Sequence, residues 1–124
     1  MFRILIIDDD LETRLMLRET LEGAGYEVEE AENGTEGLNL YRRRPIHLII
    51  TDVFRPEKGG LEVIMELRRE TRMLPIIAML GGGQLRSKEA LPSAHELGAS
   101  EILYKPFTRE DILRAVESAL QRLR

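Results

Sequence analysis

Four aspartates stand where they could take part in chemistry. Asp8, Asp9 and Asp10 directly follow an apolar run at residues 4–7, and Asp52 follows a second apolar run. Aspartates that lie close together repel one another, so a cluster either raises the pKa of one member or binds a cation. Carboxylate oxygens suit Mg²⁺, which takes one or two carboxylates and keeps several waters. A carboxylate can also attack phosphorus and form an aspartyl phosphate.

Each of these residues also has a simpler role when it is considered alone. Asp10 is placed to cap a helix, and Asp52 could cap a turn. Lys105 would add a second positive charge for phosphoryl oxygens, although a single lysine is often only a solvated side chain. The joint occurrence of these residues at predicted strand ends favours the chemical interpretation.

The elements that must position these residues alternate along the chain. Apolar runs and helical spacing predict strands at residues 2–7, 26–31, 47–51, 75–80 and 101–104. Helices are predicted from Leu11 to a stop at Gly23 and Gly25, at residues 35–43 and 59–70, from near Leu91 to Gly98, and at residues 109–123. Leu11, Leu15, Leu17 and Leu21 supply the apolar spacing of the first helix. The alternation predicts an α/β fold with a doubly wound parallel sheet.

A site is expected at one edge of this sheet. In doubly wound sheets, ligands bind beyond the carboxyl ends of the strands. The predicted first strand ends at Asp8, the third at Asp52 and the last just before Lys105. We therefore expect these residues to converge, and we expect the glycine-rich segment from Gly81 to Leu91 to be a loop.

The same residues resemble the receiver domain of two-component response regulators. The matching segments, in chain order, are RILIIDDD at 3–10, LIITDV at 48–53, Pro56 with GLE at 60–62, PIIA at 75–78, LGA at 97–99 and KPF at 105–107. The resemblance covers essentially the whole chain and implies one receiver domain over residues 1–124. It further implies a flavodoxin-like (βα)5 sheet of order 2-1-3-4-5.

The resemblance also implies roles for individual residues. Asp52 would accept a phosphoryl group from a sensor histidine kinase or phosphotransfer protein. Mg²⁺ would be held by Asp9, Asp52 and the backbone carbonyl of Phe54, with Asp8 acting through water. Lys105 would contact the phosphoryl group, and its bond to Pro106 would be cis. A downstream protein would bind the face formed by the fourth helix, last strand and last helix, and the chain would act as a regulator, not as an enzyme.

Two positions depart from the family pattern. The family has Thr or Ser at the end of the fourth strand, where this chain has Leu80, and an aromatic residue where this chain has Ile102. Tyr104 lies on the same side of its strand as Ile102 and could substitute in part. These switch positions predict that phosphorylation is coupled more weakly to the output face than in the family.

Two other interpretations of these residues differ in what they explain. A pseudo-receiver, acting as a phosphorylation-independent interaction module, would explain Leu80 and Ile102, but it need not retain Asp8, Asp9, Asp52 and Lys105. An enzyme of the haloacid dehalogenase type would explain the spacing of Asp8 and Asp10. That family has Thr or Val where this chain has Glu12, and the chain is too short to add a cap, so we discard it.

Composition excludes several further classes. The absence of cysteine excludes disulfides and thiolate chemistry, and the apolar runs are too short for a membrane span. The first 36 residues carry eleven acidic and three basic side chains, and the net charge of −4 predicts no nucleic-acid partner. With no signal peptide or anchor visible, we expect a cytoplasmic protein without a membrane partner. No DNA-binding segment follows Arg124 in this sequence, so output is expected through a partner protein or through a further portion of the protein outside it.

Overall fold

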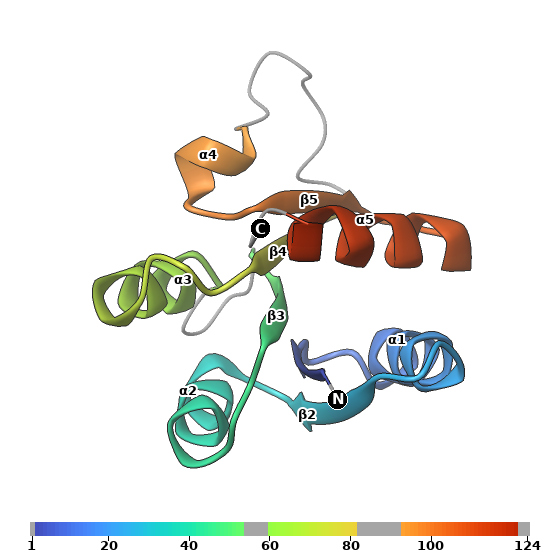
Figure 1. The fold of residues 1–124 in the computed structure, drawn as a ribbon, viewed down its shortest axis with the longest axis horizontal. Helices are drawn as coiled ribbons and strands as arrows, with labels where there is room; N and C mark the ends of the chain where they lie inside the picture. Colours follow the sequence, from blue (N-terminus) through green and yellow to red (C-terminus); the bar gives the residue numbers. More distant parts are fainter. Residues whose placement is uncertain (1, 54–59, 82–92, 122–124) are drawn as a thin grey trace.

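A parallel sheet of five strands forms the centre of the molecule (Figure 1). The computed structural model describes residues 2–53, 60–81 and 93–121. The strands are β1 (Arg3–Ile7), β2 (Glu27–Ala31), β3 (Leu48–Asp52), β4 (Ile76–Leu80) and β5 (Glu101–Tyr104). Their order in the sheet is β2-β1-β3-β4-β5, and every neighbouring pair is parallel. The predicted fold class and strand order are therefore confirmed.

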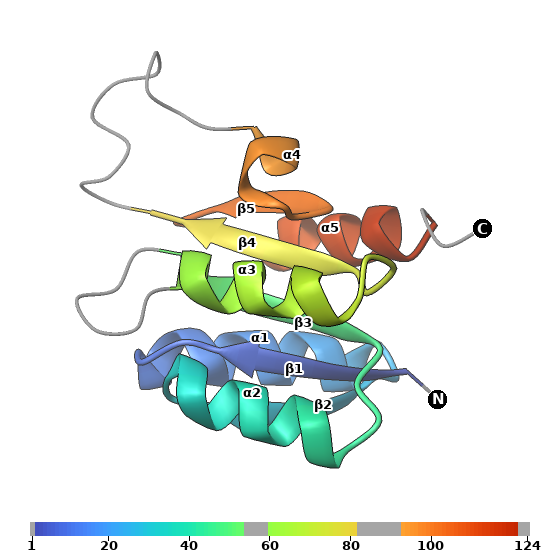
Figure 2. The same cartoon turned by 90° about the vertical axis from the view of Figure 1, so that its left-hand side faces the viewer.

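The helices cover both faces of the sheet (Figures 1 and 2). They are α1 (Leu11–Gly23), α2 (Gly34–Arg43), α3 (Gly60–Glu70), α4 (Ala94–Leu97) and α5 (Arg109–Gln121). Residues of α1 and α5 pack with one set of strand side chains, including Ile4 and Ile6. Residues of α2, α3 and α4 pack with the alternate set, including Leu5 and Ile7. Successive side chains of a strand point to opposite faces, and both faces of β1 are covered, which explains why it is apolar from Ile4 to Ile7.

The first helix turns a different face inward than its leucine spacing suggests. Leu17 and Leu21 are fully buried, whereas Leu11 and Leu15 are exposed. Successive residues of a helix are rotated by about 100°, so Arg14 falls in line with Leu17 and Leu21, and Leu11 and Leu15 do not. The buried face of α1 therefore includes an arginine, which is only 7% exposed.

The short helix α4 has well-formed ends. Ser93 caps its start with a capping box to Glu96, and Gly98 ends it in a left-handed conformation at φ 80°. Gly98 was the predicted end of this helix, and that prediction is confirmed. The helix begins at Ala94, later than the start predicted near Leu91, because Ser93 is extended and its side chain accepts from the N–H of Glu96. The predicted start of the third helix at Gly59, the predicted end of the fifth at Leu123 and the predicted loop after Gly81 lie outside the described residues.

Arg68 of α3 links two connections at the edge of the sheet opposite the aspartates. Its Nε donates to the carbonyl oxygen of Gly98 at 2.7 Å, and its Nη1 donates to that of Leu74, also at 2.7 Å. Burial lowers the pKa of Arg68. One side chain thus joins the segment before β4 to the segment before β5.

None of the helices among residues 2–53, 60–81 and 93–121 is long and apolar enough to cross a membrane.

Candidate functional site

Three carboxylates converge at the carboxyl ends of β1 and β3, as the sequence predicts. Oxygen atoms of Asp8, Asp9 and Asp52 lie within 4.8 Å of one another. Asp8 is fully buried, Asp52 is half-buried and Asp9 is exposed. The parallel register explains the convergence, because Ile7 pairs with Thr51 and so sets the next residues of both strands side by side. We call Asp8, Asp9, Asp52 and Lys105 the acceptor corner.

Asp8 is bonded through its side chain and its backbone. Its Oδ1 accepts from the backbone N–H of Asp10 at 2.8 Å, and its Oδ2 accepts from Lys105 Nζ at 2.9 Å. Its own N–H donates to the carbonyl of Ala31 at 3.1 Å, and its carbonyl accepts from Nη1 of Arg14 at 2.7 Å. A buried carboxylate must be paired in this way, since an unpaired buried charge is very costly.

Lys105 places a positive charge among these carboxylates. Its Nζ lies 3.7 Å from Oδ2 of Asp52 as well as 2.9 Å from Asp8. Burial alone would lower the pKa of Lys105, but the hydrogen bond that Lys105 donates to Asp8 and the charges of Asp52 and Asp8 outweigh it, and the pKa is raised. The Lys105–Pro106 peptide bond is cis, as the resemblance implied.

Gly81 lets the stem of Lys105 pass close to the end of β4. A Cβ atom at Gly81 would lie 2.6 Å from Cβ of Lys105 and 2.8 Å from its Cδ. Those separations are below van der Waals contact, so a larger residue would push the lysine stem aside. The glycine therefore helps to direct Lys105 toward Asp8 and Asp52.

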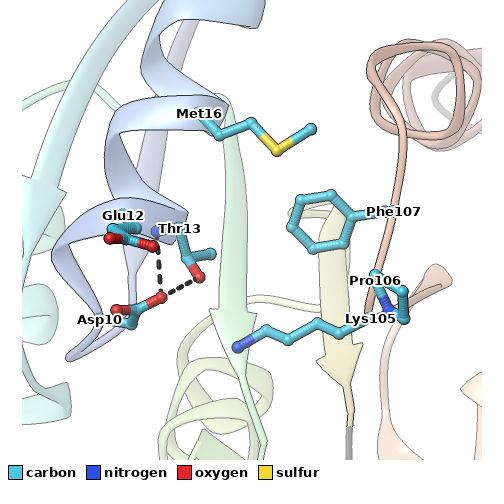
Figure 3. Close-up of a pocket in the computed structure, with 7 residues that line it drawn as sticks. All are labelled: Asp10, Glu12, Thr13, Met16, Lys105, Pro106 and Phe107. Carbon is cyan, nitrogen blue, oxygen red and sulfur yellow. Dashed lines mark hydrogen bonds between the residues drawn. The ribbon is translucent and has the colours of Figure 1, made fainter.

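Asp10 has a structural task beside the acceptor corner (Figure 3). It is the N-cap of α1, where its Oδ2 accepts from the backbone N–H of Thr13 at 3.1 Å and from Thr13 Oγ1 at 2.6 Å. The bond from the Thr13 side chain is the largest cause that lowers the pKa of Asp10. The prediction that Asp10 caps this helix is confirmed, and Asp10 is not a member of the carboxylate group.

An open pocket adjoins Lys105 on the side of α1 (Figure 3). Figure 3 shows its two walls, one from the first turns of α1 and one from the segment that follows β5. Its lining consists of Asp10, Glu12, Thr13, Met16, Lys105, Pro106 and Phe107. A molecule that enters this pocket to reach Lys105 would therefore meet both polar and apolar side chains.

The donor set fits Mg²⁺. Three carboxylates within 4.8 Å offer the oxygen ligands that this hard cation prefers. Lys105 offsets their mutual repulsion in part, and a divalent cation would relieve it further. The backbone carbonyl of Phe54, which the resemblance implied as a further ligand, lies outside the described residues.

The two switch positions lie in an apolar environment. Leu80, at the end of β4, is fully buried, and Ile102 of β5 packs against the same apolar cluster. Tyr104, which we considered as a partial substitute for an aromatic switch, pairs in register with Leu80 and is 43% exposed. We call Leu80 and Ile102 the response corner.

Arg14 is a residue of this site that the sequence analysis missed. Besides its bond to the Asp8 carbonyl, its Nε donates to Glu30 Oε1 of β2 at 2.9 Å. The available signal was its spacing: Arg14 stands three and seven residues before Leu17 and Leu21, in the buried stripe of an amphipathic helix. A charged residue in such a stripe needs a partner in the interior.

The histidines are remote from this chemistry. His47 accepts a hydrogen bond at Nδ1 from the backbone N–H of Arg3 at 2.9 Å, and its ring meets that of Phe2 edge to face. Within the ranges that the structure describes, neither His47 nor His95 belongs to a group that could hold a metal ion.

Comparisons with known proteins agree with this geometry. The family model of the response regulator receiver domain matches residues 4–117. The response regulator MprA of Mycobacterium sp. (strain KMS) is 35% identical over 120 residues, which are 97% of this chain and 51% of that protein. The chain thus spans about half the length of the curated relatives it matches.

Solved structures show the same likeness over whole chains. The chemotaxis response regulator CheY4 of Vibrio cholerae superposes with a TM-score of 0.84 at 31% identity, covering 96% of this chain and 98% of that chain. A putative response regulator from Chloroflexus aurantiacus J-10-fl gives 0.85 at 33% identity, covering 98% of each. The chain therefore belongs to the receiver domain family of two-component response regulators.

Proposed function

We propose that this receiver domain accepts a phosphoryl group on Asp52, in a reaction that depends on Mg²⁺. The observation that carries the proposal is the convergence of Asp8, Asp9 and Asp52 within 4.8 Å, with Lys105 Nζ 3.7 Å from Asp52. A carboxylate so placed can act as a nucleophile toward phosphorus. The donor would be the phosphohistidine of a sensor kinase or phosphotransfer protein.

In the proposed step, an Oδ atom of Asp52 attacks phosphorus and forms an O–P bond. The P–N bond to the donor histidine breaks, and its electron pair leaves with the imidazole. Lys105 donates a hydrogen bond to a phosphoryl oxygen, and Asp8 holds the lysine in place from 2.9 Å. Asp9 and Asp52, with Asp8 acting through water, would hold a Mg²⁺ ion, whose positive charge would neutralise the phosphoryl oxygens.

The product is the modified domain itself, so we propose a regulator and not an enzyme with a separate substrate. Its output would pass to a downstream protein through the face of α4, β5 and α5, in the cytoplasm. A phosphorylation-independent interaction module is not favoured, since such a module has no need of three carboxylates and a lysine in one place. The apolar side chains of Leu80 and Ile102 should make the output face respond weakly to phosphorylation.

Intact-mass spectrometry tests the assignment. After incubation with acetyl phosphate and Mg²⁺, we expect the parent protein to gain the mass of one phosphoryl group, which hydroxylamine removes. Asp52→Asn should gain none. Asp10→Asn is the matched control, because asparagine still caps α1 and the same charge is lost next to the site. An unmodified parent, or an adduct that persists in Asp52→Asn, would contradict the proposal.

A further inference from the structure

The peptide unit between Asp8 and Asp9 joins two carboxylates of the acceptor corner. The Asp8 side chain is fixed by its bonds from Asp10 and Lys105. The Asp9 side chain is exposed, and in the described part of the chain no hydrogen bond or ion pair of that side chain is found. The direction of the Asp9 carboxylate therefore depends on the backbone that carries it.

The carbonyl of that peptide unit is held from α1. Arg14 donates from Nη1 to the carbonyl oxygen of Asp8 at 2.7 Å, and this is a hydrogen bond from a charged donor, which is stronger than a neutral one. Its Nε donates to Glu30 at 2.9 Å, and its side chain is only 9% exposed. The guanidinium is planar and rigid, so the bond to Glu30 sets the position from which Nη1 reaches Asp8.

We propose that Arg14 is a positioning residue for the acceptor corner: its guanidinium, braced by Glu30, fixes the peptide unit between Asp8 and Asp9 and so directs the Asp9 carboxylate toward the metal ion. The effect on Mg²⁺ affinity rests on the proposed function, whereas the fixing of the peptide unit does not. Removal of a group that orients a metal ligand without touching the metal often lowers the affinity for the metal by about 10- to 100-fold.

Arg18 provides a matched control one turn along the same helix. Its Nε donates to the other oxygen of Glu30 at 2.5 Å, and its Nη2 donates to the carbonyl of Val28 in β2 at 3.1 Å. Both arginines thus bond Glu30 of β2 and one backbone carbonyl, which follows β1 for Arg14 and lies within β2 for Arg18. Only Arg14 reaches the Asp8 carbonyl, so the two differ in the contact that the proposal requires.

The first experiment needs no metal. Backbone ¹⁵N relaxation of the metal-free protein reports how rigid the Asp9 amide is. In the parent we expect an order parameter near the rigid value of about 0.85. Arg14→Gln should lower it clearly, and Arg18→Gln should leave it unchanged. An Asp9 amide that stays equally rigid in Arg14→Gln would overturn the proposal, whatever the protein does with phosphate.

The second experiment is a Mg²⁺ titration followed by calorimetry. Removing a positive charge near a cation site should strengthen Mg²⁺ binding by simple electrostatics. If Arg14 positions Asp9, Arg14→Gln should instead weaken binding by about tenfold, and Arg18→Gln should not weaken it. Equal or tighter binding in Arg14→Gln would overturn the proposal. A parent that binds no Mg²⁺ would overturn the proposed function, while the relaxation experiment would still decide whether Arg14 holds the peptide.

Urea unfolding of both variants separates positioning from loss of folding. Where Arg14→Gln does not fold, Arg14→Lys takes its place: it keeps the charge and the stem but cannot bond Glu30 and Asp8 with one planar group. Arg14→Lys should also lower the order parameter of the Asp9 amide and weaken Mg²⁺ binding, both by less than Arg14→Gln. Parent-like rigidity of Asp9 together with parent-like Mg²⁺ affinity in Arg14→Lys would show that the charge alone is needed and would overturn the proposal.

Discussion

Leu80 of the response corner ends β4 at the same edge of the sheet as the acceptor corner, but different forces hold the two corners. The acceptor corner is held by directed contacts: Asp8 accepts from Asp10 and Lys105, and Lys105 also approaches Asp52. The response corner is held by apolar packing, with Leu80 fully buried and Ile102 against the same cluster. Hydrogen bonds and ion pairs change when a phosphoryl charge is added nearby. Apolar contacts do not depend on charge, so the added charge gives Leu80 and Ile102 no new bonding partner.

The difference indicates that accepting a phosphoryl group and responding to it are separable properties. A ligand shifts a two-state equilibrium only by its different interaction with the two states. A hydroxyl at the end of β4 could bond a phosphoryl oxygen in one state and not in the other, and Leu80 cannot. We therefore expect full acceptor chemistry together with weak coupling to β5 and α5.

The largest expected effect is on the acceptor corner. Asp9→Asn should lower Mg²⁺ affinity by on the order of tenfold or more, since it removes a charged ligand from a site that depends on charge. Asp10→Asn removes the same charge from the next residue and keeps the helix cap, so its affinity should stay close to that of the parent. Calorimetric titration measures both. Superimposable titration curves for Asp9→Asn and the parent would show that Asp9 is not a ligand of Mg²⁺.

The next effect concerns the response corner. Leu80→Thr should strengthen the response, at a cost of about 1–3 kcal/mol in the free energy of unfolding, because it buries a hydroxyl and loses apolar contact. Amide NMR with beryllofluoride should then show larger shifts across β5 and α5 than in the parent. Leu80→Val is the control, since it reduces volume without adding a hydroxyl. Large shifts in the parent that Leu80→Thr leaves unchanged would break the comparison.

A smaller effect is expected where the two corners meet, at Gly81. Gly81→Ala should slow phosphorylation of Asp52 by acetyl phosphate a few-fold, because the new Cβ would displace the stem of Lys105. Gly23→Ala is the matched control: its nearest neighbour would be Arg109 Nη2 at 3.7 Å, an ordinary contact. Rapid-quench mass spectrometry compares the rates. Equal rates in the two variants would mean that Lys105 does not depend on Gly81.

The smallest effect is a dependence on pH. The folded-state pKa of Lys105 is raised above the unfolded value of about 10.4, so its contribution to stability is complete below that pH and is lost as the pH rises through the folded pKa. The difference in unfolding free energy between the parent and Lys105→Met should therefore stay constant from about pH 7 to 9 and shrink above about pH 10.4. Arg114→Met, at an exposed ion pair, should show no such change.

Much of the fold follows from local pattern. Apolar runs and glycine stops predict every strand and helix in order, and the described ends lie within one or two residues of the predicted ones except at the start of α4. Parallel strands then bring Asp8 and Asp52 to one edge. The role of Arg14 could not be predicted in the same way. It depends on a long side chain that crosses from α1 to β2 and back to the end of β1, and a pattern of side-chain types does not specify such a path.

The bonds of Arg68 make two loops into one cooperative unit. Since one guanidinium donates to the carbonyls of Leu74 and Gly98, opening of either connection removes one of the bonds that hold the cation in place for the other. Local unfolding is therefore expected to expose the segments before β4 and before β5 together. The edge of the domain farthest from the aspartates is thus expected to exchange its amide hydrogens as a single block, at one common free energy.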